Sequence, residues 1–339
     1  MATAFAPFHD QIHTAPPKLV GIARMAAESP KTRERASVEY FSLQSRSALN
    51  RESSGRMPFD WTLNPYRGCE FGCKYCYARY THEFMELWDG ADFERKIFAK
   101  INAPQLLRAE LVRARDRGQS IALGTATDPY QPAEKQFEIT RRMLEVFADL
   151  EGAAFSITTK SVLILRDLDL LKTIATRHRF SVHLTVTTTD ERLARLLEPK
   201  APPAAKRLEA ARQLAEAGIR VCVNVMPILP GITDDPPALE EVARQAAAAG
   251  ARSIHGNVLF LMPSAMRYFM PFLETEFPEL AGRYRRLYAR SAYLGGEYKE
   301  RIGRLMAGLR EKYGLADRGD RPWPPKPGQM ALFEPNPTE

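Results

Sequence analysis

Residues 64–77 read NPYRGCEFGCKYCY, and the cysteines in this stretch have the spacing Cys-x3-Cys-x2-Cys. These three cysteines are Cys69, Cys73 and Cys76. The chain of 339 residues has only one other cysteine, Cys222, far away in the sequence. Such clustering indicates a metal site rather than a disulfide framework. Gly68 and Gly72 would let the backbone turn sharply and approach the metal closely.

Three thiolates from one short loop suit a 4Fe–4S cluster. A cubane cluster has four irons, so three thiolates leave one iron without a protein ligand. The amine and carboxylate of S-adenosylmethionine (SAM) can chelate that iron. Arg67 and Lys74 place positive charge beside the anionic cluster and would tune its potential. The ligand set therefore predicts reductive cleavage of SAM and radical chemistry on a substrate.

Two other interpretations of the cysteine loop are a zinc site and a set of buried structural cysteines. Zinc in a structural site takes four protein ligands, and His82 would have to be the fourth at an unusual spacing. Structural cysteines would need neither two glycines nor an aromatic residue before the third cysteine. The corresponding functional alternative is a metal-binding protein without catalysis.

Outward from the loop, short apolar runs alternate with longer amphipathic stretches as far as about residue 261. The predicted strands are Phe59–Asn64, Ser120–Gly124, Ala153–Thr158, Ser181–Thr187, Arg220–Met226 and Ser253–Leu261. One or more helices are predicted within Arg79–Arg117. The other predicted helical segments are Glu134–Leu150, Leu165–His178, Glu191–Ala217 and Ala238–Ala249. This alternation predicts an α/β fold, an open, partial (β/α)6 barrel with helices outside a parallel sheet. The active site is then expected at the carboxyl ends of the strands.

The flanking segments divide the chain into four parts. Residues 1–58 show little periodicity and are predicted to be an irregular N-terminal lead-in. The barrel core is expected over 59–262, and a C-terminal helical extension over 263–316. Residues 317–339 are rich in proline and are predicted to be a disordered tail.

The Cys-x3-Cys-x2-Cys loop, with Tyr75 before its last cysteine, resembles the signature of the radical SAM superfamily. The wider string 64–79 is similar to the branch related to spore photoproduct lyase. Three further segments agree with that branch: GTATDPYQP at 124–132, TKS at 159–161 and LEPK at 197–200. Together these motifs cover roughly residues 60–262.

The resemblance implies a set of SAM contacts at strand ends. They are Tyr75 and Met226 near the adenine, Thr125, Thr127 and Asp128 at the methionine group, Lys160 at the carboxylate, and Thr185 near the ribose. From the residues alone, Asp128 before Pro129 could simply start a turn. The threonines could satisfy the same turn, Lys160 could be a surface lysine and Met226 a core residue. Glu198 and Arg207 are predicted to form a structural ion pair.

The sequence departs from that branch at one position. Spore photoproduct lyase uses a cysteine just beyond its second strand to return a hydrogen atom to its product radical. The matching segment here, 124–128, has no cysteine, and Cys222 inside the fifth strand is predicted to be a core residue. Photoproduct reversal by that route is therefore in doubt. The possible hydrogen donors are Tyr77, Tyr80 and Tyr130.

The partners follow partly from charge and partly from the resemblance. A net charge of +7 permits nucleic-acid binding without requiring it. The resemblance implies DNA as substrate, with a lyase or repair activity; RNA, a peptide or a small molecule are the alternatives. An electron donor such as flavodoxin or ferredoxin is expected. With no apolar run of membrane-spanning length and no signal peptide, we expect a cytoplasmic protein without a membrane partner.

The tail carries one short motif. Residues 329–333, QMALF, are similar to the Gln-x-x-Leu-Phe motif by which bacterial repair and replication proteins bind the DNA sliding clamp. Gln329, Leu332 and Phe333 would be the contact residues. The alternatives are that this end packs back on the barrel, or that five residues match by chance.

Overall fold

The computed structural model describes residues 19–55 and 57–316. Its main sheet has seven strands in the order β11-β10-β9-β8-β7-β4-β3. These strands are β3 (Leu49–Arg51), β4 (Trp61–Leu63), β7 (Ser120–Leu123), β8 (Ala154–Thr159), β9 (Arg179–Thr185), β10 (Val221–Ile228) and β11 (Ser253–Val258). From β4 to β11 the strands pair in parallel and in chain order, and β3 pairs antiparallel with β4 at one edge. The predicted partial (β/α)6 barrel is confirmed.

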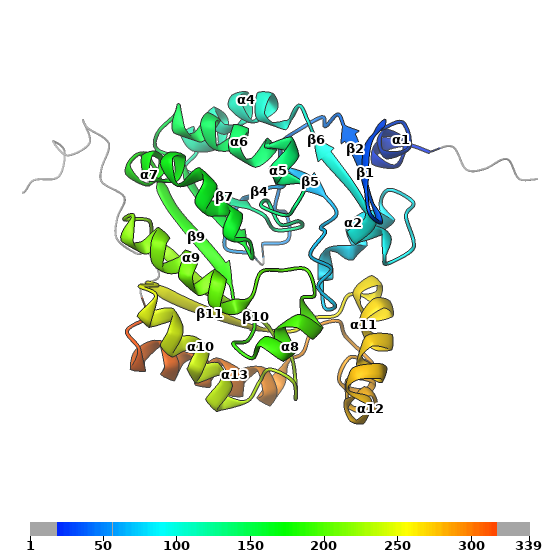
Figure 1. The fold of residues 1–339 in the computed structure, drawn as a ribbon, viewed down its shortest axis with the longest axis vertical. Helices are drawn as coiled ribbons and strands as arrows, with labels where there is room; N and C mark the ends of the chain where they lie inside the picture. Colours follow the sequence, from blue (N-terminus) through cyan, green and yellow to red (C-terminus); the bar gives the residue numbers. More distant parts are fainter. Residues whose placement is uncertain (1–18, 56, 317–339) are drawn as a thin grey trace, which may run out of the picture.

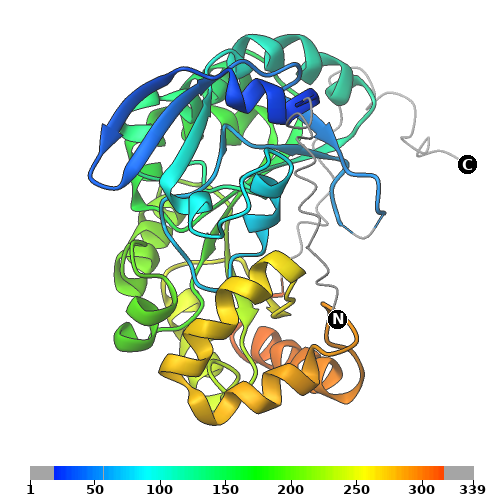
Figure 2. The same ribbon diagram turned by 90° about the vertical axis from the view of Figure 1, so that its right-hand side faces the viewer.

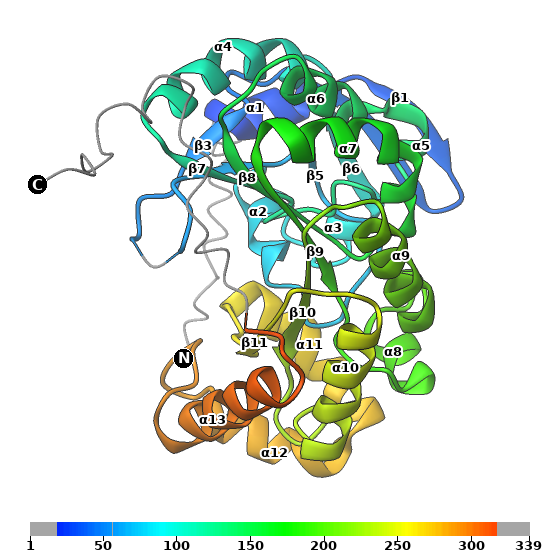
Figure 3. The same cartoon turned by 90° about the vertical axis from the view of Figure 1, so that its left-hand side faces the viewer.

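Helices cover the outer face of this sheet (Figure 3). They are α4 (Ala103–Asp116), α5 (Glu134–Phe137), α6 (Ile139–Ala148), α7 (Leu168–Arg177), α9 (Ala204–Glu216) and α10 (Pro236–Ala248). Alternate strand residues such as Val182, Leu184 and Val221 are fully buried in the apolar layer beneath these helices. Because side chains alternate along a strand, the residues between them face the inside of the barrel.

Local signals fix several helix ends. Asp190 caps the start of α8 (Glu191–Leu197), where its carboxylate accepts a hydrogen bond from the backbone N–H of Leu193. The glycines predicted to stop α9 and α10, Gly218 and Gly250, have φ values of +81° and +76°.

The predicted continuous helical segment Glu191–Ala217 is wrong. The structure splits it into α8 and α9. Pro199, Pro202 and Pro203 lie between them, and proline lacks the N–H that a continuous helix would need. The 3-10 helix η2 (Val162–Asp167) similarly precedes α7 where one helical segment was expected.

The N-terminal lead-in is predicted to be irregular, but its described part forms regular secondary structure. It contains α1 (Gly21–Ala27), β1 (Lys31–Arg35) and β2 (Val38–Leu43), besides β3. A second sheet has the order β1-β2-β6-β5, with β6 (Lys96–Lys100) parallel to β2 and β5 (Tyr66–Arg67) antiparallel to β6 (Figure 2). Strand β6 lies inside the segment predicted to be helical, Arg79–Arg117. Pairing between segments so far apart in sequence leaves no local pattern to detect.

Three helices fill the predicted C-terminal extension: α11 (Pro263–Glu276), α12 (Pro278–Leu287) and α13 (Gly296–Lys312). Helix α13 packs beside α10 and β11. Helices α11 and α12 pack against each other, at the lower right of Figure 1. No helix among the described residues is long and apolar enough to cross a membrane. The clamp-like motif with Gln329, Leu332 and Phe333 lies outside the described residues.

Candidate active site

The cysteine loop leaves the second sheet at β5 and returns to it at β6, passing through η1 (Tyr77–Arg79), α2 (Tyr80–Glu83) and α3 (Asp92–Arg95). All three cysteines are free thiols, with Cys73 buried and the other two partly buried. The backbone N–H of Cys69 donates to the Phe93 carbonyl at 2.8 Å, and that of Lys74 donates to the Leu197 carbonyl at 2.9 Å. The loop is thus tied both to its own return segment and to the end of α8.

The two glycines of the loop are required by its path. Gly68 has a φ of +83°, and a Cβ atom there would lie 2.8 Å from the carbonyl oxygens of Phe93 and Lys96. Gly72 has a φ of +63°, and a Cβ atom there would lie 2.6 Å from the Glu94 carboxylate. Both positions exclude larger residues because backbone conformation and space each favour glycine.

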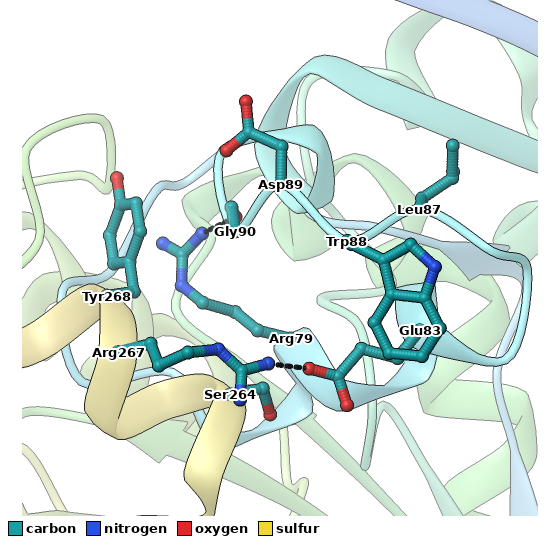
Figure 4. Close-up of a pocket in the computed structure, with 9 residues that line it drawn as sticks. All are labelled: Arg79, Glu83, Leu87, Trp88, Asp89, Gly90, Ser264, Arg267 and Tyr268. Carbon is teal, nitrogen blue, oxygen red and sulfur yellow. Dashed lines mark hydrogen bonds and ion pairs between the residues drawn. The ribbon is translucent and has the colours of Figure 1, made fainter. Parts of the chain in front are cut away.

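The buried Arg79 side chain stabilises the cysteine loop. Its guanidinium donates to the Cys73 carbonyl at 3.1 Å and pairs with Glu94 at 3.2 Å. It also stacks on the ring of Tyr268 from α11, 3.4 Å from the centroid, and the Tyr268 hydroxyl donates to Glu94 at 3.0 Å. Arg79 and Tyr268 line a cavity of about 270 Å³ (Figure 4), whose lining includes none of the predicted SAM contacts.

The thiol arrangement fits a cluster better than a single zinc ion. Among the described residues, the only group of three potential ligands gathered within 4.8 Å of one another lies elsewhere, on the barrel strands. Three thiolates on one loop suit a cluster, in which each thiolate binds a different iron. His82, the alternative fourth zinc ligand, is buried against Phe93 and Phe98, with Nε2 hydrogen-bonded to the Lys96 carbonyl at 2.9 Å.

The end of β7 is joined to the cysteine loop by its threonines. The Thr127 hydroxyl donates to the Gly68 carbonyl at 2.6 Å, just before the first cysteine. The Asn64 side-chain amide donates to the Thr125 hydroxyl at 3.1 Å, and the Thr125 carbonyl accepts a hydrogen bond from the Tyr77 hydroxyl. Both threonines thus fix the loop relative to the strand end.

Asp128 is fully engaged in its own turn. Its carboxylate accepts hydrogen bonds from the Thr159 hydroxyl at 2.6 Å, the Lys160 N–H at 2.7 Å and the Tyr130 N–H at 2.9 Å. Burial raises the pKa of Asp128, although these hydrogen bonds oppose the shift. Asp128 therefore stabilises the turn that it starts, and a contact from Asp128 to SAM stays a prediction.

Glu198 is the electrostatic centre of the site. One carboxylate oxygen accepts hydrogen bonds from the hydroxyls of Tyr75 and Thr187 and lies 4.0 Å from the Lys160 ammonium. The other oxygen pairs with Arg207 at 2.6 Å, and both side chains are buried. The predicted Glu198–Arg207 ion pair is present, and it also positions Tyr75 and Lys160.

Burial and charge set the protonation of this region. Burial raises the pKa of Cys73 to about 12, despite the nearby Lys160 charge, and raises that of Cys69 well above its usual range. Burial lowers the pKa of Lys160, but Cys73 and Glu198 outweigh it, so the net shift is upward. Cys69 and Cys73 are thus neutral thiols near a cationic lysine, and metal binding would release their protons.

The other two predicted contacts lie on neighbouring strands. Thr185 ends β9, and its carbonyl accepts a hydrogen bond from Arg207 at 3.0 Å, which links it to Glu198. Met226 lies on β10, two residues beyond Asn224, the register partner of Thr185. The structure therefore gathers Tyr75, Lys160 and Thr185 around one ion pair, and Met226 follows on the neighbouring strand.

Sequence reasoning missed three positioning residues. Asn64 and Gln131 join the loop to the β7 end, and Thr187 supports Glu198. Gln131 is fully buried, and its amide donates to the Gly68 carbonyl at 3.1 Å and the Thr127 hydroxyl at 2.9 Å. Asn64 and Gln131 both lie inside the quoted motifs, so the signal was present there.

Solved structures with the same fold include spore photoproduct lyase. Its complex with dinucleoside spore photoproduct matches with a TM-score of 0.60 at 16% identity, over 81% of this chain and 79% of that one. A double mutant of the lyase with bound AdoMet and the same dinucleoside matches with a TM-score of 0.59 at 15% identity, over 80% and 78%. At this level of identity the likeness concerns the fold.

Sequence comparisons extend over most of the chain. An uncharacterized protein of Mycobacterium tuberculosis is 38% identical over 85% of this chain and 86% of its own length. Another, from Methanocaldococcus jannaschii, is 31% identical over 65% of this chain and 77% of its own length. The family model of the radical SAM superfamily matches residues 63–258, which hold the cysteine loop and the parallel strands. The chain therefore belongs to the radical SAM superfamily and is an enzyme of that class.

Proposed function

We propose that Cys69, Cys73 and Cys76 hold the 4Fe–4S cluster that family membership implies, with SAM at the ends of β7, β8 and β9. When bound, the cluster and SAM supply a radical that abstracts a hydrogen atom from the substrate. The observation that carries the proposal is the shared position of Tyr75 and Lys160 on Glu198. The cysteine loop and the end of β8 are thereby brought together at the Glu198 carboxylate.

The chain's own residues would bind and orient SAM and exclude water from the site. The Lys160 ammonium offers a charge-assisted hydrogen bond to the SAM carboxylate, and Thr185 offers a contact near the ribose. Thr125, Thr127 and Asp128 are proposed at the methionine group, and Tyr75 and Met226 at the adenine. Apolar side chains from α11 and α12 pack around the loop and keep water away from it.

Replacing Lys160 with alanine should raise the dissociation constant for SAM about tenfold or more. A charge-assisted hydrogen bond of this kind contributes about 1.5–3 kcal/mol. The cluster should still assemble, because Lys160 is not a ligand. Calorimetric titration of SAM into the cluster-loaded protein measures the effect.

The matched control is Lys172→Ala on α7, where the lysine is exposed. Its dissociation constant for SAM should equal that of the unchanged protein, and Lys160→Arg should recover part of the lost affinity. A Lys160→Ala protein with unchanged SAM affinity would show that the lysine serves only the ion-pair network.

We further propose DNA as the substrate, in a lyase or related repair reaction. The fold is shared with a lyase solved with a dinucleoside photoproduct, and the net charge of +7 suits a polyanion. A flavodoxin or ferredoxin is the proposed electron donor. The competing substrates are RNA, a peptide or a small molecule.

A buried lysine and a partly buried arginine support a phosphate-bearing substrate. Arg67 and Lys100 lie on the same face of the second sheet, since Arg67 is the register partner of Phe98 and Lys100 follows two residues later. Lys100 is only 5% exposed, and neither side chain forms an ion pair with another described residue. Burial and the Arg67 charge lower the pKa of Lys100 to about 7, and a phosphate group beside it would supply the negative charge that favours the ammonium form.

The hydrogen donor must differ from the cysteine of spore photoproduct lyase, because 124–128 has none. Of the three candidate tyrosines, Tyr77 fits best, since its hydroxyl lies at the Thr125 carbonyl and its ring packs on Phe260. Tyr130 is completely buried, and Tyr80 packs edge-on against Phe84.

Deuterium transfer tests the substrate. The probes are ultraviolet-irradiated DNA deuterated in its thymidines, the same DNA without irradiation, and a deuterated RNA of matching sequence. We expect label in 5′-deoxyadenosine only from irradiated DNA, measured by mass spectrometry. Label from RNA alone would favour the modification alternative, and label from none of them would overturn the DNA proposal.

The tail motif gives a separate prediction, namely that the protein binds the sliding clamp on DNA. A peptide spanning residues 326–335 should bind the bacterial sliding clamp, because Leu332 and Phe333 offer two apolar anchors and Gln329 a hydrogen bond. A binding titration measures this, with Leu332→Ala and Phe333→Ala peptides as controls. Absence of binding at high micromolar peptide, or binding indifferent to both changes, would contradict the proposed clamp contact.

A further inference from the structure

Three potential metal ligands meet inside the barrel, away from the cysteine loop. His183, Cys222 and His255 come from the adjacent strands β9, β10 and β11, and their ligand atoms lie within 4.8 Å of one another. In the sheet register, Cys222 pairs directly with His183, and Asn224 pairs with His255. Three strands of one hydrogen-bonded sheet therefore hold these side chains rigidly.

These residues face the interior of the barrel. Their strand neighbours Val182, Val221 and Ile254 are fully buried in the apolar layers under the outer helices. Since side chains alternate along strands, His183, Cys222 and His255 point to the opposite, concave face. That face also carries Thr185, two residues beyond His183 at the proposed SAM site.

Each imidazole is oriented by a serine of its own strand. The Ser181 hydroxyl lies 3.1 Å from Nε2 of His183, and the Ser253 hydroxyl lies 3.2 Å from Nε2 of His255. Such outer hydrogen bonds are typical of metal-binding histidines, whose other nitrogen then faces the ion. The Nδ1 atom of His183 has only a long contact of 3.4 Å to the Asn224 side chain.

The two imidazole rings lie close to each other across the strands. The rings of His183 and His255 stack with centroids 5.8 Å apart and an angle of 22°. Neutral imidazole is the form that binds metal ions.

We propose that His183, Cys222 and His255 form a second metal site, for a divalent ion of zinc type. Two imidazoles and one thiolate are an established ligand set for zinc, with an open fourth position in catalytic sites. Ligand atoms around tetrahedral zinc lie about 3.5 Å apart, from bond lengths of about 2.0–2.3 Å. Small side-chain rotations would close the present separation. The fourth position faces the barrel interior, where a water or a substrate atom can bind.

The test removes the three loop cysteines, so that any thiolate signal must come from Cys222. In a full-length Cys69→Ala, Cys73→Ala, Cys76→Ala protein, Cys222 is the only cysteine left, because the chain has four. Cobalt(II) titrated anaerobically should produce a thiolate-to-cobalt charge-transfer band and the visible bands of tetrahedral cobalt. Zinc should then displace the cobalt and abolish both signals.

Three further changes in that background are decisive. Cys222→Ser should remove the charge-transfer band, and His183→Ala or His255→Ala should each weaken cobalt binding at least tenfold, as loss of a ligand requires. His178→Ala, at a histidine outside the barrel interior, serves as the control and should leave cobalt affinity unchanged. No cobalt signal from Cys222, or a signal indifferent to both histidines, would overturn the site.

A second measurement avoids dependence on the triple variant. In the cluster-loaded protein with all cysteines present, the loop thiols are occupied, and zinc can be counted by mass spectrometry after dialysis. We expect about one zinc per chain, lost in Cys222→Ser with no loss of iron. Zinc content unchanged by Cys222→Ser would contradict the proposal, whereas loss of iron would count against the proposed cluster ligands.

Discussion

Cys73→Ala is expected to abolish both cluster assembly and SAM cleavage. Two thiolates cannot retain a cubane cluster that also needs an open iron for SAM. No replacement ligand is at hand, since the neighbouring His82 is turned to the Lys96 carbonyl and packs between aromatic rings. Cys69→Ala and Cys76→Ala should behave alike. Iron and sulfide content after anaerobic reconstitution, with chromatographic assay of 5′-deoxyadenosine, measures both effects.

Cys222→Ala is the matched control. Cys222 is as buried as Cys73 but lies on β10, outside the loop. This variant should keep its iron and its SAM cleavage, even though the proposed zinc would be lost. Full SAM cleavage by a Cys73→Ala protein would refute the assignment of the cluster ligands.

The second large effect is expected at the buried ion pair. Arg207→Met should lower the free energy of unfolding by about 3–5 kcal/mol, because it leaves the Glu198 charge buried without its main partner. The change also removes hydrogen bonds from Arg207 to the Thr185 carbonyl at 3.0 Å and to the Pro202 carbonyl at 2.7 Å. Urea unfolding followed by circular dichroism measures the loss.

Arg212→Met on the same helix is the control for this prediction. Arg212 pairs with Glu209 and Glu216 at the exposed surface, where water screens the charges. It should leave the free energy of unfolding nearly unchanged. If Arg207→Met cost no more stability than Arg212→Met, Glu198 would not be the centre of the site.

The sequence predicted what depends on local pattern. Apolar runs marked all six parallel strands, Gly218 and Gly250 ended their helices, and the cysteine spacing identified the loop. It did not predict the second sheet, because β2 and β6 are far apart in sequence and each is short. It also merged α8 with α9, although the three intervening prolines were visible.

The site was predicted less completely than the fold. The resemblance to the radical SAM superfamily implies Thr125 and Lys160 as SAM contacts at strand ends, but the role of Glu198 in joining Lys160 to Tyr75 depends on tertiary contacts. Cys222 was predicted to be a core residue. It is buried, yet it lies on the concave polar face beside two histidines, a juxtaposition that only the strand register creates.

The central claim is that this chain cleaves SAM at a cluster held by the cysteine loop. Its most direct test is to incubate the anaerobically reconstituted, full-length protein with SAM and dithionite and to quantify 5′-deoxyadenosine and methionine. We predict that both appear in equal amounts, that both require the reductant, and that neither forms with the Cys73→Ala protein. A protein with a full complement of iron and sulfide that released no 5′-deoxyadenosine under reduction would contradict the account.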